Sequence, residues 1–213
     1  MKSNLLVVVA VAYLLGVIWI AHFFAPPAYT WTTNTVSELA AQGSPNGWIM
    51  QVGLTGFGIL LCIAIVQCWA ECGRIYPPDI PLLVYGIAIL ASGVFSAAPI
   101  DPAQPYSAFE AGLHSVMATL AGIALSAAIG WRMWLAARVS YRIFHLVMLL
   151  LVFGLSLLFG LSENGVLALP LGVVQRLLYL AGLGWLAAVP WLCPLGGMGA
   201  QQAGEADFSL RSK

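Results

Sequence analysis

The stretch NLLVVVAVAYLLGVIWIAHFF, residues 4–24, decides the fold class because it is almost entirely apolar and contains no Asp, Glu, Lys or Arg. An α-helix needs about 20 mostly apolar residues to cross the hydrocarbon core of a bilayer. Five further runs of this kind follow at residues 47–69, 82–98, 109–131, 143–161 and 171–193. None alternates polar and apolar residues as a membrane β-strand does. The sequence therefore predicts an all-α, polytopic membrane protein, a bundle of six transmembrane helices.

The composition excludes the main soluble classes of protein. Of 213 residues, 61% are hydrophobic and only 8% are charged, whereas soluble domains carry about 25% charged residues. So few charges cannot cover the surface of a soluble enzyme or keep a chain disordered in water. The net charge of zero gives no attraction to nucleic acid. The expected partners are membrane lipids, and an oligomer or a larger membrane complex stays open.

The chain reads as a single transmembrane domain, residues 1–193, followed by a polar tail, residues 194–213. Short connections rich in Pro, Gly and Asn separate the apolar runs, as in a compact bundle. The tail is expected to be flexible and cytoplasmic. The first apolar run is longer than the 7–15 residues typical of a signal peptide, so we expect a retained first helix.

The basic residues predict the orientation in the membrane. With six helices, seven of the eight fall on one side: Lys2, Arg74, Arg132, Arg138, Arg142, Arg211 and Lys213. Because basic residues concentrate on the cytoplasmic side, both termini are predicted to be cytoplasmic, in a multi-pass protein of the cell inner membrane. Cys68, Cys72 and Cys193 map to the same reducing side, so we expect no disulfide there. His145 is interpreted as an anchor for lipid head groups at this interface.

Polar residues gather on the opposite side, which corresponds to the periplasm or outer leaflet. His114 and Arg176 lie about five residues inside their predicted helices, at similar depth, so we expect one shared cavity. Ionisable groups at such positions are costly unless they face the interior and have partners. Glu110, His114, Ala118, Gly122, Ser126 and Gly130 recur every four residues. Such a ridge of small residues is typical of close helix packing, and it predicts an interior Glu110–His114 pair.

Three functions remain open for this polar group. The first is binding or handling of a lipid or other amphiphile with an anionic head, with Arg176 as the clamp. The candidate binding residues are Arg176, Gln175, Glu38, Ser37, Ser107, Glu163 and Asn164. The second is an intramembrane enzyme in which His114 is the general base, Glu110 or Asp101 orients it, and Arg176 stabilises negative charge. The third is a structural or accessory subunit in which Arg176 neutralises Glu163 or Glu110 and ties helices together.

Metal and cofactor motifs are missing from the sequence. His22, Glu110 and His114 do not have the spacing of a zinc site. There is no haem-type histidine pair and no glycine-rich loop for a phosphate. We therefore predict neither a metal site nor a cofactor.

Several stretches resemble the bacterial and archaeal membrane family known as domain of unknown function 998. They are VSELAAQGSP at residues 36–45 with the glycines of the second apolar run, Pro99-Ile100-Asp101 ahead of His114, and GVVQRL at residues 172–177 followed by Trp185. The layout is also similar to that of six-helix proteins of the DRAM and Frag1 type. The resemblance implies six helices and points to Glu38, Asp101, His114 and Arg176, but it implies no established reaction.

Overall fold

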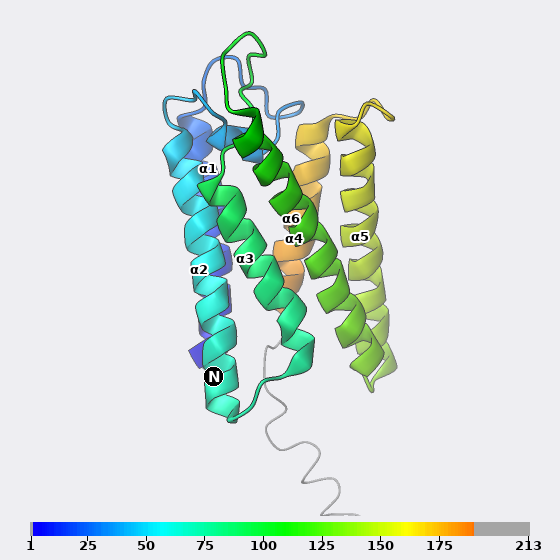
Figure 1. Ribbon diagram of the computed structural model, residues 1–213. Coiled ribbons are helices and arrows are strands. Elements are labelled where there is room, and N and C mark those ends of the chain that lie inside the picture. Colours follow the sequence, from blue (N-terminus) through cyan, green and yellow to red (C-terminus); the bar gives the residue numbers. More distant parts are fainter. Residues whose placement is uncertain (1, 190–213) are drawn as a thin grey trace, which may run out of the picture.

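The computed structural model describes residues 2–189, and this part of the chain is helical with two short 3-10 turns (Figure 1). The elements are α1 (Lys2–Phe23), η1 (Ser37–Ala40), α2 (Gly47–Cys72), η2 (Pro77–Asp79), α3 (Ile80–Val94), α4 (Ala108–Leu135), α5 (Val139–Glu163) and α6 (Leu171–Ala188). All six α-helices, α3 together with η2, are long and apolar enough to cross a membrane. The predicted six-helix membrane fold is therefore confirmed.

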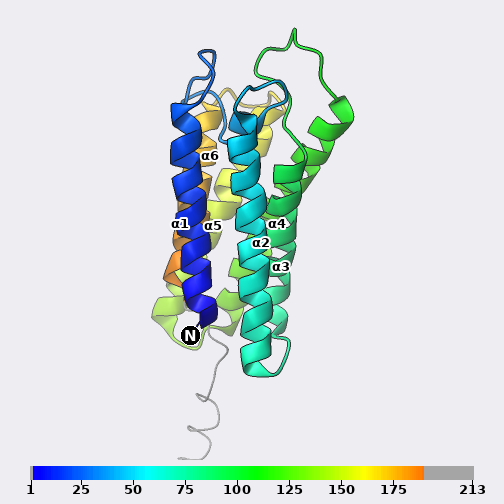
Figure 2. The same cartoon turned by 90° about the vertical axis from the view of Figure 1, so that its left-hand side faces the viewer.

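The six helices form a closed ring, because each packs against the next and α6 also contacts α1 (Figures 1 and 2). The connections 24–46, 95–107 and 164–170 lie at one end, which we call the long-loop end. The N-terminus and the connections 73–76 and 136–138 lie at the other end, which we call the basic end (Figure 2).

Burial follows what a lipid environment requires. Trp185, Phe57 and Leu61 are almost completely buried within the bundle. Large apolar side chains such as Trp19, Ile123 and Leu150 are exposed, in a pattern that would aggregate in water. In a bilayer these outward faces contact acyl chains, so the exposed apolar surface is the surface that touches lipid.

One boundary differs from the sequence prediction in a way that affects the long-loop end. The third apolar run was expected to be helical to residue 98, but α3 ends at Val94 and the backbone of Phe95 is extended. The carbonyl of Ala97 then accepts a hydrogen bond from the backbone N–H of Gln42, at 2.9 Å, so this segment pairs with a loop instead of continuing the helix. The predicted tail, residues 194–213, lies outside the described residues.

The cysteines and His145 correct two further expectations. Cys62 and Cys68 are free, but Cys72 is disulfide-bonded, so the expectation of no disulfide is wrong at this position. His145 is only 6% exposed, and its Nδ1 accepts a hydrogen bond from Trp185 Nε1 at 3.0 Å. It is thus a core residue between α5 and α6 and not a head-group anchor.

Glycines of α2 allow its neighbours to approach closely. A Cβ at Gly58 would lie 2.5 Å from the carbonyl oxygen of Gly86 and 2.7 Å from the backbone nitrogen of Leu90, both on α3. Backbone atoms cannot move aside as a flexible side chain does. Gly58 is therefore required by the α2–α3 contact.

Replacing Gly58 by Ala should lower the free energy of unfolding by about 1–3 kcal/mol, because overpacking forces the two helices apart. Gly16→Ala is the matched control, since a Cβ at Gly16 meets no atom within 4 Å and Ala favours a helix more than Gly does. Unfolding in detergent measures both variants. Equal stability of the two would contradict the packing argument.

The basic end contains a buried ion pair. Arg132, in the last turn of α4, bonds to the carboxylate of Asp79 at the start of α3. Both side chains are largely buried. A buried charge that loses its partner is destabilising because its desolvation is no longer compensated.

Asp79→Leu should therefore lower the free energy of unfolding by about 3–5 kcal/mol. The double variant Asp79→Leu with Arg132→Met should recover most of this loss, since it leaves no buried charge. Arg138→Met, which removes an exposed arginine near the same end, serves as the control. If the single variant is as stable as the unaltered protein, the ion pair carries no structural role.

Candidate functional site

The first turn of α6 holds the loop that follows α1. The N–H groups of Gly172 and Val173 donate to the carbonyls of Thr33 and Thr32, at 3.2 Å and 3.1 Å. The first N–H groups of a helix have no partner within that helix, so the loop satisfies them. A Cβ at Gly172 would collide with the backbone of this loop, which explains the glycine at the start of α6.

Gln175 attaches η1 to α6. Its side chain is 7% exposed, and Oε1 accepts hydrogen bonds from the backbone N–H of Val36 at 2.6 Å and of Ser37 at 3.3 Å. Its Nε2 donates to Ser37 Oγ at 3.1 Å. Gln175 and Ser37, two predicted binding residues, are thus brought together, and they bind each other.

Arg176 lies beside Gln175 and reaches toward α1. One terminal nitrogen, Nη1, donates to the carbonyls of Asn34 at 3.0 Å and Gly172 at 2.8 Å. The other, Nη2, donates to His22 Nε2 at 2.8 Å and to the hydroxyl of Tyr29. Its guanidinium carbon lies 5.5 Å from the ring centroid of Trp31, within range for a cation–π contact. We call these residues the Arg176 network.

The positive charge of Arg176 has no acidic counterpart in this network. Within residues 2–189 no carboxylate oxygen lies within 4.0 Å of its guanidinium. The predicted neutralisation of Arg176 by Glu163 or Glu110 is therefore not seen. All four of its partners by hydrogen bond are neutral acceptors.

Tyr29 and His22 keep fixed hydrogen-bonding roles toward this cation. The Tyr29 hydroxyl donates to the carbonyl of Thr35 at 3.0 Å, and burial raises the pKa of Tyr29 although Arg176 lowers it. The phenol therefore stays protonated. His22 Nδ1 lies 2.6 Å from the carbonyl of Ile18, which makes Nδ1 the donor and leaves Nε2 as the acceptor from Arg176.

His114 lies near the end of α3 and not in the Arg176 network. It is 5% exposed, and its Nδ1 is 2.8 Å from the carbonyl of Ser92 and 2.9 Å from that of Phe95. Because carbonyls only accept, Nδ1 carries a proton. No residue in the described part of the chain forms a hydrogen bond with Nε2.

The expected contact between Glu110 and His114 does not form. Glu110 Oε1 accepts a hydrogen bond from the backbone N–H of Ser96, at 2.8 Å. Both side chains therefore bind backbone groups around the end of α3. Because α3 stops at Val94, carbonyls that a longer helix would satisfy are left for His114.

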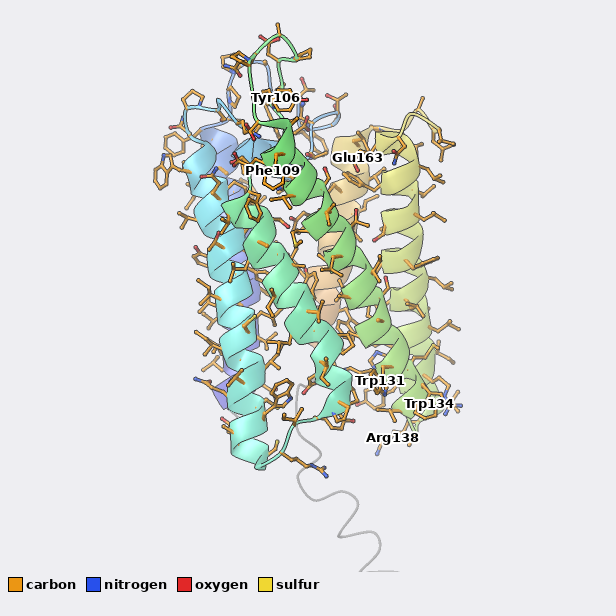
Figure 3. The ribbon with its side chains drawn as sticks, viewed as in Figure 1. Tyr106, Phe109, Trp131, Trp134, Arg138 and Glu163 are labelled. Atoms are coloured by element: carbon orange, nitrogen blue, oxygen red, sulfur yellow. The ribbon has the colours of Figure 1, made fainter. Side chains whose placement is uncertain are left out.

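Two further carboxylates, Glu38 and Glu163, belong to the long-loop end. Glu163 is the exposed last residue of α5. Figure 3 shows Glu163 at the long-loop end of the bundle. Glu38 is half-buried, and its Oε2 accepts a hydrogen bond from the backbone N–H of Thr35.

The remaining predicted residues have local roles. Ser107 is the N-cap of α4 and accepts from the N–H of Glu110 at 3.3 Å. Asp101 is exposed and accepts from the N–H of Ala103 at 2.9 Å. Asn164 is exposed and donates to the carbonyl of Gly160 at 2.7 Å. Nothing in these contacts joins them to Arg176 or His114.

The predicted site residues thus fall into two groups, the Arg176 network at the start of α6 and the contacts of His114 and Glu110 at the end of α3. Glu38 lies in η1, the element that Gln175 attaches to α6. Sequence reasoning missed Tyr29 as a member of the Arg176 network. Among residues 2–189 no three His, Cys, Asp or Glu side chains are placed to hold a metal ion.

Gln175→Leu should release η1, because the buried N–H groups of Val36 and Ser37 lose their acceptor. A buried donor left unpaired costs about 1–3 kcal/mol. Hydrogen exchange at residues 35–40 should accelerate in this variant. The control is Gln67→Leu, which alters an exposed glutamine of α2. Unchanged exchange in Gln175→Leu would mean that other contacts hold the loop.

Comparison with known proteins identifies a family without a described activity. No curated protein matches the chain, and no solved structure matches it either. A family model described as "Protein of unknown function (DUF998)" matches residues 7–192. This match includes most of α1, all of α2 to α6, and both His114 and Arg176. The chain therefore belongs to the DUF998 family.

Proposed function

We propose that this protein lies in the cell inner membrane with both termini in the cytoplasm and binds an amphiphile with an anionic head. The head group would bind at the long-loop end, in the outer leaflet. Arg74, Arg132, Arg138 and Arg142 support this orientation, because all four belong to the basic end and basic residues favour the cytoplasmic side.

The uncompensated charge of Arg176 carries the proposal. A guanidinium near the hydrocarbon region is costly unless an anion or an aqueous cavity compensates its charge. Its neutral acceptors satisfy its N–H groups but not its charge. A phosphate or carboxylate supplies both the hydrogen-bond acceptor and the negative charge, which makes its hydrogen bonds about twice as strong as neutral ones.

The two terminal nitrogens of Arg176 have different roles in this proposal. Nη1 is held by backbone carbonyls, which keep the guanidinium in place. Nη2 is bound by two side chains, His22 and Tyr29. Side chains change rotamer more readily than backbone moves, so an anionic oxygen enters by replacing one of them at Nη2.

Exposed aromatic side chains lie along the path that the apolar part would take. Trp19 and Phe23 on α1, Phe24 after it, and Trp31 in the loop are all exposed. Aromatic rings of this kind prefer the interface between head groups and acyl chains. The tails of the amphiphile would run along the outward face of α1, below Arg176.

A structural role is the second candidate, and it has its own supporting observation. The terminal N–H groups of Arg176 are already bonded to protein acceptors. In that case Arg176 braces the loop against α6 and binds nothing else. The two candidate functions predict different results when a substitution removes the positive charge of Arg176.

Arg176→Gln should remove the bound amphiphile and leave the bundle folded. Losing a hydrogen bond to a charged group costs about 1.5–3 kcal/mol, or roughly a tenfold to hundredfold weaker Kd. Native mass spectrometry of protein released from lipid nanodiscs measures retained lipid. Arg142→Gln, which alters an exposed arginine near the basic end, should retain it.

Two outcomes would overturn the proposal. A folded Arg176→Gln protein that retains lipid as the unaltered protein does would exclude Arg176 as the clamp. An unaltered protein without bound lipid, together with an Arg176→Gln variant that unfolds, would establish the structural role.

A further inference from the structure

His22 occupies the nitrogen of Arg176 at which the proposed anion enters. The imidazole Nε2 lies 2.8 Å from Nη2 of Arg176, and the imidazole Nδ1 lies 2.6 Å from the carbonyl oxygen of Ile18. A guanidinium only donates and a carbonyl only accepts. The arrangement therefore requires a proton on Nδ1 and a lone pair on Nε2, which is the neutral form of His22.

A second proton on the imidazole would break this contact. It would bond to Nε2 and turn that atom from an acceptor into a donor. Two N–H groups would then face each other, and an imidazolium would lie beside a guanidinium without a negative charge between them. Protonation of His22 thus frees Nη2 of Arg176 and adds a second positive charge at the same position.

The loop after α1 supplies the other titratable groups near His22. Tyr29 contacts the imidazole edge to face, with ring centroids 5.7 Å apart, and its phenol stays protonated because burial raises its pKa. Glu38 interacts electrostatically with Tyr29, but its Oε2 accepts a hydrogen bond from the backbone N–H of Thr35. The loop therefore surrounds His22 with one neutral phenol and one carboxylate that is bound to backbone.

No acidic side chain of residues 2–189 forms an ion pair with either member of this pair. Neither Arg176 nor His22 has a described carboxylate oxygen within 4.0 Å. The only charged residue of α2, which packs against α1, is Glu71 at the basic end. Arg176 is the only charged residue of α6. An anion from outside the protein would compensate both positive charges.

We propose that anion binding at Arg176 is coupled to proton uptake by His22, so that one anionic group lies between an imidazolium and a guanidinium. The inference rests on the proposed function, since it describes the control of the same site. One proton from water bonds to Nε2 of His22, the hydrogen bond from Arg176 to Nε2 is lost, and oxygens of the anion accept from both side chains. Such charge-assisted hydrogen bonds are about twice as strong as neutral ones.

Coupling of this kind makes binding depend on pH. Histidine side chains change charge between about pH 5 and 8, and both His22 and Arg176 are half-buried, so the protein does not enclose either of them. The anion stabilises the protonated form of His22, so binding favours protonation and protonation favours binding. The affinity for the anion should therefore fall as the pH rises, by at most about tenfold per pH unit for one proton.

Isothermal titration calorimetry of the purified full-length protein in a neutral detergent tests the coupling. The probe is dihexanoyl phosphatidylglycerol, whose phosphodiester keeps one negative charge in this range, whereas a phosphate monoester would itself titrate near about pH 6. From about pH 5.5 to about 7.5 the affinity of the unaltered protein should fall at least about tenfold, because histidine loses its proton in this interval. Titrations at about pH 7.5 in two buffers of different ionisation enthalpy should report an uptake close to one proton per anion.

His22→Gln should remove both signals. The glutamine carbonyl can accept from Nη2 of Arg176 as the neutral imidazole does, but the side chain takes up no proton, so the affinity should not change with pH. His145→Gln is the matched control, because it removes a histidine of the core between α5 and α6 and leaves an acceptor for Trp185; the pH dependence should persist. Arg176→Gln should abolish binding at every pH.

The results separate the coupling from the proposed function. If the unaltered protein binds the probe equally well across this range, or binds it without proton uptake, the clamp stands and the coupling is wrong. If His22→Gln keeps the pH dependence, another group takes up the proton and the assignment to His22 is wrong. If His22→Gln does not fold, the proton uptake of the unaltered protein still decides whether the coupling exists.

Two further results concern the clamp and the source of the anion. If the unaltered protein binds no probe at any pH, or Arg176→Gln binds it equally well, the proposed function itself fails. If glycerophosphoglycerol, the same head group without acyl chains, binds as tightly as the lipid and with the same proton uptake, the coupling stands but the ligand is a soluble anion.

Discussion

The contact between the first turn of α6 and the loop after α1 is the constraint on which the long-loop end depends. A helix leaves its first N–H groups unpaired, and in a membrane protein other parts of the protein must satisfy them. Here Gly172 and Val173 donate to loop carbonyls, and Gln175 accepts from η1. The same turn positions Arg176 against that loop. The segment thereby covers the end of the ring and brings Tyr29 and Glu38 toward α6.

At the end of α3 the unpaired backbone groups are carbonyls, and the side chain of His114 donates hydrogen bonds to them. His114 Nδ1 donates to both the Ser92 and the Phe95 carbonyl, and no described residue forms a hydrogen bond with its second nitrogen. The two carbonyls fix the orientation of the ring and require a proton on Nδ1. The site therefore arises where one helix begins and another ends, and its chemistry is set by which atoms those two ends leave unsatisfied.

The fold was largely predictable, whereas the sequence predicted only some residues of the site and few of their contacts. Six apolar runs correspond to six helices because length and polarity decide insertion locally, and the resemblance to DUF998 is confirmed by the family match. The pairing of Glu110 with His114 was wrong, because spacing along one helix takes no account of the open carbonyls of its neighbour. The early end of α3 was missed, since Ser96 and Ala97 are compatible with a helix, and hydrogen bonds with Gln42 and Glu110 hold them outside it.

By itself the sequence determined that the chain is a six-helix membrane protein, that basic residues gather at one end, and that His114 and Arg176 lie at the other. These properties depend on composition and order along the chain. Only the tertiary structure decided the partners: backbone carbonyls, His22 and Tyr29 for Arg176, and the α3 end for His114. The physical reason is that these partners are mostly backbone atoms. Because almost every residue has the same backbone groups, the sequence does not indicate which of them the fold places beside Arg176 or His114.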